Sequence, residues 1–310
     1  MANIMNFSQP TPASAPQHYK ENTRNYHAFR RGMYLYPCDE DEKDRMDIYH
    51  KIFEVARRGQ LHTAPIISSH NEPARIMDVG CGTGIWAIDI ADRYPTAEVL
   101  GLDLVNIQPE KIPPQLRFRV PIDHEGPWTF GEESWDLIHI QQACGSISSW
   151  PELYQKAFAH LKPGSGYIEQ VEIDLKPRCD DGTLLPDSPL HEWYNYLDDA
   201  TNRANRPIAF NAATKEQLRA AGFIDIREQI IRAPLNGWPN DPHQRQIGRW
   251  YYIGLSEGLE ALSAAPFTRI FRWDFTEHVL PLCGRVKKEM TNHKVHAYNN
   301  IHIITARKPL

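Results

Sequence analysis

A glycine-rich turn between a buried strand and a helix constrains this chain more than any other feature of its sequence. Ile76-Met77-Asp78-Val79 is typical of a strand, the turn Gly80-Cys81-Gly82-Thr83-Gly84 follows, and Ile85 to Tyr94 is typical of a helix. Glycines without a Cβ let backbone N–H groups and the positive helix N-terminus approach a ligand closely. We therefore expect a ligand-binding loop here, with Cys81 as a small apolar filler.

The spacing of the glycines excludes two familiar nucleotide-binding loops. A dinucleotide fingerprint is G-x-G-x-x-G, but Ile85 stands where its third glycine belongs, and no Gly-Lys-Ser/Thr of a P-loop follows. Asp103 comes 19 residues after Gly84, at the end of the next strand. An acidic residue at that place in an open α/β sheet accepts hydrogen bonds from the two hydroxyls of a ribose.

Short strand-like and helix-like runs alternate along residues 75–174, the pattern of a parallel sheet covered on both faces. We expect strands at 75–79, 98–103, 116–120, 135–140, 166–174, 224–231 and 300–306, with helical insertions at about 186–205 and 236–290. We also expect helix caps at Asp39, Ser149 and Thr214. The organisation predicted is a disordered tail (1–24), an N-terminal arm and helix (25–70) and one α/β domain (71–310).

Composition excludes several classes of function. The 34 basic and 39 acidic side chains give a net charge of −5, which argues against direct binding of nucleic acid through a basic face. The sequence has no apolar stretch long enough for a membrane helix, so we expect a soluble intracellular chain. Five cysteines without a C-x-x-C pair predict neither a disulfide framework nor a zinc site. His293, His296 and His302 lack a carboxylate or thiolate at ligand spacing, so we predict no metal.

The glycine turn, Asp103, Ile122-Asp123, the aspartate-led fourth strand and His160-Leu161-Lys162-Pro163-Gly164 together resemble a class I S-adenosylmethionine-dependent methyltransferase. The resemblance implies a Rossmann-like α/β fold, a seven-stranded sheet of order 3-2-1-4-5-7-6 with the seventh strand antiparallel, and S-adenosylmethionine as the cofactor. It also implies the residues around that cofactor: Asp78, Gly80, Cys81, Gly82 and Gly84 under the methionine part, Asp103 and Leu104 at the ribose, Ile122 and Asp123 at the adenine, and Gln141 closing the site.

A narrower resemblance extends over almost everything after residue 25. Tyr26-His27, Pro37-Cys38-Asp39-Glu40, Trp238-Pro239-Asn240-Asp241-Pro242 and Ile301-His302-Ile303-Ile304-Thr305-Ala306-Arg307-Lys308-Pro309 are similar to the LaeA family of filamentous fungi. That family implies a nuclear regulator of secondary metabolism and sporulation, able to shuttle with the cytoplasm and working with velvet-domain proteins. The same motifs occur in LaeA-like paralogues, so both assignments stay open at this point.

Methyl transfer depends mainly on positioning, because the sulfonium already activates the methyl group, and a base is needed only if the acceptor must lose a proton. Acidic or imidazole groups at the carboxyl ends of the fourth and fifth strands are the catalytic candidates: Glu172 and His139 first, then Glu169 and Asp174. Tyr26, His27, Arg30 and Tyr34 are candidates for a lid over the cofactor or for a packed arm. Trp238, Trp250 and Tyr251 either line an acceptor pocket or belong to the core.

Three functions are compatible with the residues alone. The first is a methyltransferase acting as a nuclear regulator, the second a biosynthetic methyltransferase for a small molecule, and the third a scaffold that binds the cofactor without catalysis. The acceptor has no signature in the sequence, since the chemistry requires no particular nucleophile.

Overall fold

A seven-stranded, mostly parallel sheet organises the protein in the computed structural model, which describes residues 18–29, 31–66 and 72–310. Its spatial order is β5 (Leu116–Arg119), β4 (Glu98–Leu102), β3 (Arg75–Val79), β6 (Leu137–Gln141), β7 (Tyr167–Arg178), β9 (Tyr298–Arg307) and β8 (Ile224–Pro234). Strand β9 runs antiparallel to both β7 and β8. When the seven strands β3 to β9 are renumbered 1 to 7 in chain order, their spatial order is 3-2-1-4-5-7-6. The predicted α/β fold and strand order are therefore confirmed.

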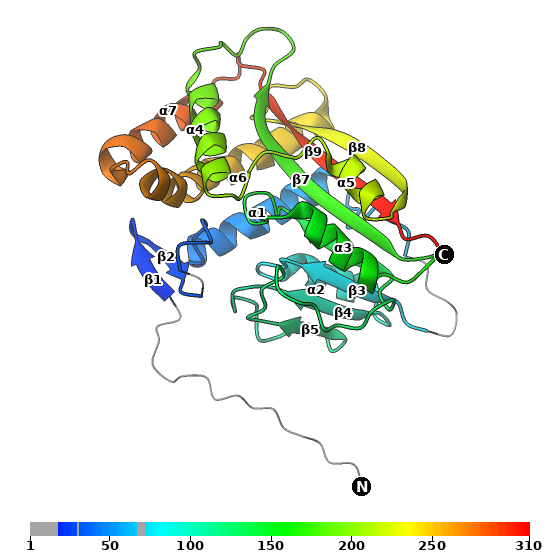
Figure 1. The fold of residues 1–310 in the computed structure, drawn as a ribbon. Helices are drawn as coiled ribbons and strands as arrows, with labels where there is room; N and C mark the ends of the chain where they lie inside the picture. The colour runs from blue at the N-terminus through cyan, green and yellow to red at the C-terminus, as the bar shows by residue number, and fades with distance from the viewer. Residues whose placement is uncertain (1–17, 30, 67–71) are drawn as a thin grey trace.

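Helices cover both faces of the sheet (Figure 1) because the central strands are apolar on both sides. In β3, Ile76 packs in the cluster beneath α2 (Ile85–Arg93), whereas its neighbour Met77 packs in the cluster beneath α3 (Trp150–His160). Alternate residues of β3 therefore enter two different cores. A further short helix, α5 (Thr214–Ala220), precedes β8.

The expected helical insertions follow β7 and β8. Helix α4 (Pro189–Arg203) comes after β7, and α6 (Pro242–Ala265), the π-helical turns η1 (Pro266–Ile270) and η2 (Phe275–Val279), and α7 (Leu280–Met290) come after β8. Helix α1 (Glu40–Ala56) packs against α6, so the N-terminal helix and the second insertion share one core. No helix among the described residues combines the length and apolarity needed to cross a bilayer.

Two of the three predicted helix caps are confirmed. The side chain of Asp39 accepts a hydrogen bond from the Glu42 N–H, and that of Ser149 accepts one from the Glu152 N–H. The prediction for Thr214 is wrong, because Ala213 occupies the cap without a side-chain bond and Thr214 is buried in the first helical turn.

The predicted disordered tail is wrong for residues 18–24. Strands β1 (His18–Glu21) and β2 (Arg24–His27) form an antiparallel hairpin, while residues 1–17 lie outside the described part of the chain. Arg269 holds the hairpin, since its guanidinium pairs with Glu21 at 3.0 Å and lies 4.7 Å from the ring centroid of Tyr26. That partner is some 250 positions away, so no local pattern could predict the hairpin.

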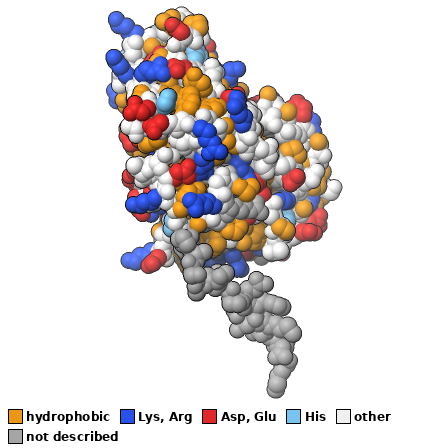
Figure 2. Space-filling view, turned by 60° about the vertical axis from the view of Figure 1, so that its left-hand side comes forward, with side chains coloured by type: hydrophobic (Ala, Val, Ile, Leu, Met, Phe, Trp, Pro, Cys, Tyr) orange, Lys and Arg blue, Asp and Glu red, His pale blue; other side chains and the backbone are white. Residues whose placement is uncertain are grey.

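On the face shown in Figure 2, Lys and Arg side chains are interspersed with acidic and hydrophobic ones. The hydrophobic side chains gather in several places on this face, with basic groups between them. The charges on this face are thus mixed in sign.

Candidate cofactor and methyl-transfer site

A cavity opens at the carboxyl ends of β3, β4 and β6, where ligands bind in open α/β sheets. Its empty volume is about 1690 Å³, including the part open to solvent. Helix α1, Phe29 and residues between 33 and 38 of the N-terminal arm also line it. The cavity is therefore bounded both by the sheet edge and by the N-terminal arm.

The glycine turn forms one wall of this cavity. Gly80 and Gly82 line it with φ angles of +75° and +56°, in the left-handed region that favours glycine. A Cβ on Gly82 would lie only 2.9 Å from the Met46 sulfur. Gly84 differs from the prediction, because it lies behind the turn, where a Cβ would meet the Phe118 ring at 2.3 Å. Its role is to let the helix pack closely against β5.

Asp103, at the end of β4, faces the same cavity. Its carboxylate accepts hydrogen bonds from the N–H groups of Gly82 at 2.8 Å and Val105 at 2.9 Å. Burial raises the pKa of Asp103 to about 6, while these backbone donors work in the opposite direction. The following residue, Leu104, also lines the cavity. Asp103 thus stands beside the glycine turn, as a ribose-binding carboxylate must.

The remaining predicted cofactor residues divide into two groups. Asp78, Cys81, Asp123, Gln141 and Tyr34 line the cavity, as expected. Ile122 and Tyr26 are not among the described residues that line it. The Ile122 N–H instead donates to the Asp103 carbonyl at 2.7 Å, and Tyr26 is buried in the N-terminal hairpin against Tyr19 and Arg269. Of the other lid candidates, Arg30 lies outside the described residues and His27 contacts Phe29.

Glu172 is the catalytic candidate that reaches the cavity. Its side chain is buried, lines the cavity and accepts hydrogen bonds from the N–H groups of Ala143 at 3.1 Å and Cys144 at 3.2 Å. Burial raises the pKa of Glu172 to about 7, against the effect of those donors. The carboxyl group therefore fixes the chain that leaves β6. The role of Glu172 as a catalytic base stays a prediction.

His139 does not face the reactants, contrary to the prediction. Its Nδ1 lies 2.9 Å from Asp78 Oδ1, and its ring stacks on Trp86 with 3.6 Å between centroids. The side chain is fully buried, and burial lowers its pKa to about 3, so the imidazole is neutral. Because a neutral ring donates through Nδ1 to the carboxylate, His139 orients Asp78 from beneath the cavity.

The other two carboxylates are structural. Glu169 forms a buried ion pair with Arg57 at 2.6 Å and also accepts the Thr63 and Ala64 N–H groups. Asp174 pairs with Arg178, four residues along β7. Both carboxylates already have ion-pair partners, and neither is among the described residues that line the cavity.

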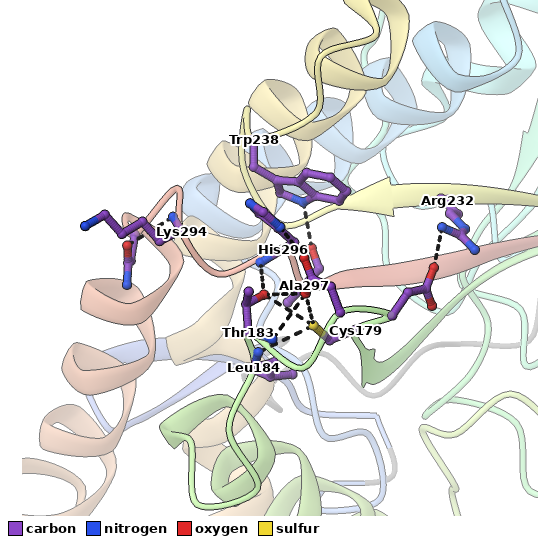
Figure 3. Close-up of polar contacts among 11 residues, drawn as sticks. Cys179, Thr183, Leu184, Arg232, Trp238, Lys294, His296 and Ala297 are labelled. Carbon is purple, nitrogen blue, oxygen red and sulfur yellow. Dashed lines mark hydrogen bonds and ion pairs between the residues drawn. The ribbon is translucent and has the colours of Figure 1, made fainter.

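The aromatic candidates for an acceptor pocket lie elsewhere in the fold. Figure 3 shows Trp238 beside His296, and the two rings stack with 4.6 Å between centroids. The indole N–H of Trp238 donates to the Ala297 carbonyl, while Tyr251 belongs to the core shared by α1 and α6 and the partly buried Trp250 packs against that core. Within the described residues, no group of three or more His, Cys, Asp and Glu side chains is placed to hold a metal ion.

Sequence reasoning missed the contribution of α1 to the cavity. Met46 and His50 line it from two successive turns of this helix, together with Arg45 and Tyr49. Their spacing places Met46 and His50 on one helix face, which was the available signal. This face lines the cavity only because α1 packs against α6, a contact that the spacing within α1 does not predict.

We expect the substitution Glu172→Gln to remove a pH-dependent loss of stability. The folded-state pKa of about 7 lies above the ordinary value of 4.5, so the stabilisation linked to this carboxyl is full below pH 4.5 and is lost as the pH rises through about 7. At about 1.4 kcal/mol per pKa unit, the free energy of unfolding of the wild type should fall by a few kcal/mol more than that of the variant as the pH rises across this range. Urea unfolding of the cofactor-free protein at several pH values measures it.

Glu152→Gln is the matched control, because Glu152 is an exposed carboxylate in the first turn of α3. Its pH profile should run parallel to that of the wild type. A Glu172→Gln profile that also runs parallel to the wild type would refute the raised pKa.

Comparisons with known proteins relate the chain to methyltransferases and to named regulators. A family model described as a methyltransferase domain matches residues 49–228. The secondary metabolism regulator LAE1 of Cochliobolus heterostrophus is 66% identical over 300 residues, which cover 97% of each chain. The protein-methionine methyltransferase laeA of Emericella nidulans is 50% identical, over 95% of this chain and 77% of its own. Phosphoethanolamine N-methyltransferase 2 of Haemonchus contortus, solved with S-adenosyl-L-methionine, aligns with a TM-score of 0.49 at 16% identity, covering 86% of this chain and 57% of that one.

The residues present fit S-adenosylmethionine: two glycines leave room for it, Asp103 is placed for its ribose, and Asp123 lines the neighbouring wall. The match to the methyltransferase model covers more than half of the chain, and the relatives match nearly all of it. The chain therefore belongs to the LaeA family of S-adenosylmethionine-dependent methyltransferases.

Proposed function

We propose that this methyltransferase acts in the nucleus, in exchange with the cytoplasm, as a regulator of secondary metabolism and sporulation, together with velvet-domain proteins. The observation that carries the proposal is 66% identity, over 97% of both chains, to a protein named as a secondary metabolism regulator. Nuclear location, sporulation and velvet partners come from the family resemblance of the sequence. The net charge of −5 supports protein partners, rather than direct contact with DNA, as the route to chromatin.

We further propose a methionine side chain of a protein as the methyl acceptor, because one relative is named a protein-methionine methyltransferase. When bound, the cofactor supplies a methyl group on a positively charged sulfonium sulfur. A thioether attacks with a sulfur lone pair: the new S–CH₃ bond forms as the old one breaks, and the positive charge passes to the acceptor. No proton leaves the acceptor, so no general base is required.

The chain's own part in this reaction is binding and alignment. Gly80, Gly82 and Asp103 form the wall for the cofactor, and Glu172 holds the N–H groups of Ala143 and Cys144 beside it. Tyr36 and Ile208 lie next to Gly145 and line the same cavity. The aromatic and aliphatic surfaces of these two side chains suit an uncharged thioether.

Complementation tests the regulatory role. In a Cochliobolus heterostrophus strain lacking LAE1, the wild-type chain should restore secondary-metabolite production, and the Asp103→Ala variant should not. The control Glu98→Ala changes an exposed carboxylate on the same strand and should complement fully. Failure of an expressed wild-type chain would contradict the regulatory role, and full complementation by Asp103→Ala would show that methylation is not needed for it.

Partners and location are tested in the same strain. A tagged chain should enter the nuclear fraction and co-precipitate velvet-domain proteins. Exclusion from nuclei, or precipitates free of velvet-domain proteins in extracts that contain them, would contradict these two parts of the proposal.

The methyl acceptor is tested by mass spectrometry. After incubation of the protein with methyl-labelled cofactor, the label should be found on methionine. Label confined to another residue type or to a small molecule would contradict it.

A further inference from the structure

Helix α1 lies directly against the glycine turn of the cofactor site. The Thr83 hydroxyl donates to the Asp47 carboxylate at 2.7 Å, and the Met46 sulfur closes the space beside Gly82. His50 follows Met46 by four residues, so the two side chains lie on one face of the helix. The face of α1 that touches the turn therefore carries His50 into the cavity, which it lines.

One ring nitrogen of His50 is engaged and the other is not. Its Nε2 lies 2.8 Å from Asp89 Oδ2, and because a carboxylate only accepts, Nε2 carries the hydrogen of that bond. Nδ1 is completely buried and has no hydrogen-bond partner among the described residues. In the neutral ring this arrangement leaves Nδ1 as an acceptor, with its lone pair in a residue only 5% exposed.

The surroundings of His50 favour a positively charged, hydrogen-donating ligand group. Asp78 lines the same cavity as His50. The neutral His139 holds Asp78 from below. A carboxylate and a lone pair in one buried corner would repel an anionic group and attract an ammonium group, which has donors only.

We propose that His50 Nδ1 accepts a hydrogen bond from the α-ammonium group of the methionine part of the bound cofactor, beside the Asp78 carboxylate. The inference rests on the assignment of this cavity as the S-adenosylmethionine site. It makes the N-terminal helix part of cofactor recognition. His50 is then a binding residue, and Asp89 positions it by fixing which ring nitrogen carries the hydrogen.

Calorimetry with three ligands tests this contact: S-adenosylhomocysteine, its decarboxylated analogue, which keeps the amine, and 5′-methylthioadenosine, which lacks the amino-acid part. The substitution His50→Gln retains a group that reaches Asp89 but removes the acceptor at Nδ1. We expect it to weaken binding of the first two ligands about equally, by roughly tenfold for a lost charge-assisted bond. Binding of 5′-methylthioadenosine should not change.

His50→Asn is the rescue variant, since its side-chain oxygen can replace Nδ1 as an acceptor; it should recover part of the lost affinity. His243→Gln is the matched control, because His243 meets the Val55 carbonyl near the end of α1 and is not among the described residues that line the cavity. It should bind all three ligands as the wild type does.

Three results would overturn the contact: unchanged affinity of His50→Gln, a loss that disappears with the decarboxylated analogue, or an equal loss with 5′-methylthioadenosine. The second would assign His50 to the carboxylate, and the third to the fold or the nucleoside. Should His50→Gln fail to fold, His50→Asn decides, since it must then bind the two amine-bearing ligands better than His50→Ala. A wild-type chain that binds none of the ligands would instead refute the cofactor site itself.

Discussion

Replacing Asp103 by alanine is expected to weaken binding of S-adenosylhomocysteine by at least about 100-fold, because hydrogen bonds to a charged group contribute roughly 1.5–3 kcal/mol each and two ribose hydroxyls lose their acceptor. The substitution also removes the acceptor for the N–H groups of Gly82 and Val105, so the glycine turn loses part of its support. Isothermal titration calorimetry measures the affinity directly and requires no knowledge of the methyl acceptor.

Glu98→Ala provides the control for Asp103→Ala. Glu98 begins the strand that Asp103 follows, but it pairs with Arg75 at the opposite, exposed end. The Glu98→Ala variant should bind S-adenosylhomocysteine as tightly as the wild type does. If the Asp103→Ala variant binds as tightly as Glu98→Ala, the ribose assignment of Asp103 is wrong.

The largest expected effect on stability comes from Arg57→Ala. Arg57 and Glu169 form an ion pair whose side chains are 3% and 0% exposed. Removing one partner of a buried pair leaves the other charge without compensation in a medium that solvates it poorly, so we expect a loss of about 3–5 kcal/mol in the free energy of unfolding. Urea denaturation of the wild type and the variant measures this difference.

Arg285→Ala is the matched control for Arg57→Ala. Arg285 pairs with Glu192 at a comparable 2.8 Å, but these side chains are 52% and 36% exposed. Exposed pairs contribute at most about 1 kcal/mol, so this variant should unfold almost as the wild type does. Equal losses in the two variants would show that burial of the Arg57–Glu169 pair does not determine its contribution.

Several site residues were predictable because their positions follow from local rules. A glycine turn after a strand, and an acidic residue at the end of the next strand, lie at one sheet edge in any parallel α/β fold. Gly80, Gly82 and Asp103 therefore appear where the sequence predicts them. Glu172 follows the same logic, because it stands on β7 beside the carboxyl end of β6.

The wrong assignments have a common physical origin. His139 lies on a buried strand at the correct edge, but successive side chains of a strand point to opposite faces, and its ring packs beneath the site on Trp86. Tyr26 fits a lid by composition but is held by Arg269, a residue of the second helical insertion. In each case a contact distant in sequence decides where the side chain points.

The residues by themselves determined the alternation of strands and helices and the wall that Gly80, Gly82 and Asp103 build, because glycine freedom, strand period and helix caps act within a few residues. The strand order and the cofactor came from the resemblance of the sequence to class I methyltransferases. Only the tertiary structure decided which groups complete the cavity. The packing of α1 on α6 brings Met46 and His50 to the glycine turn, and the ion pair with Arg57 distinguishes the structural Glu169 from the cavity-lining Glu172. Such docking depends on apolar surfaces from distant segments meeting, and no local sequence pattern records that.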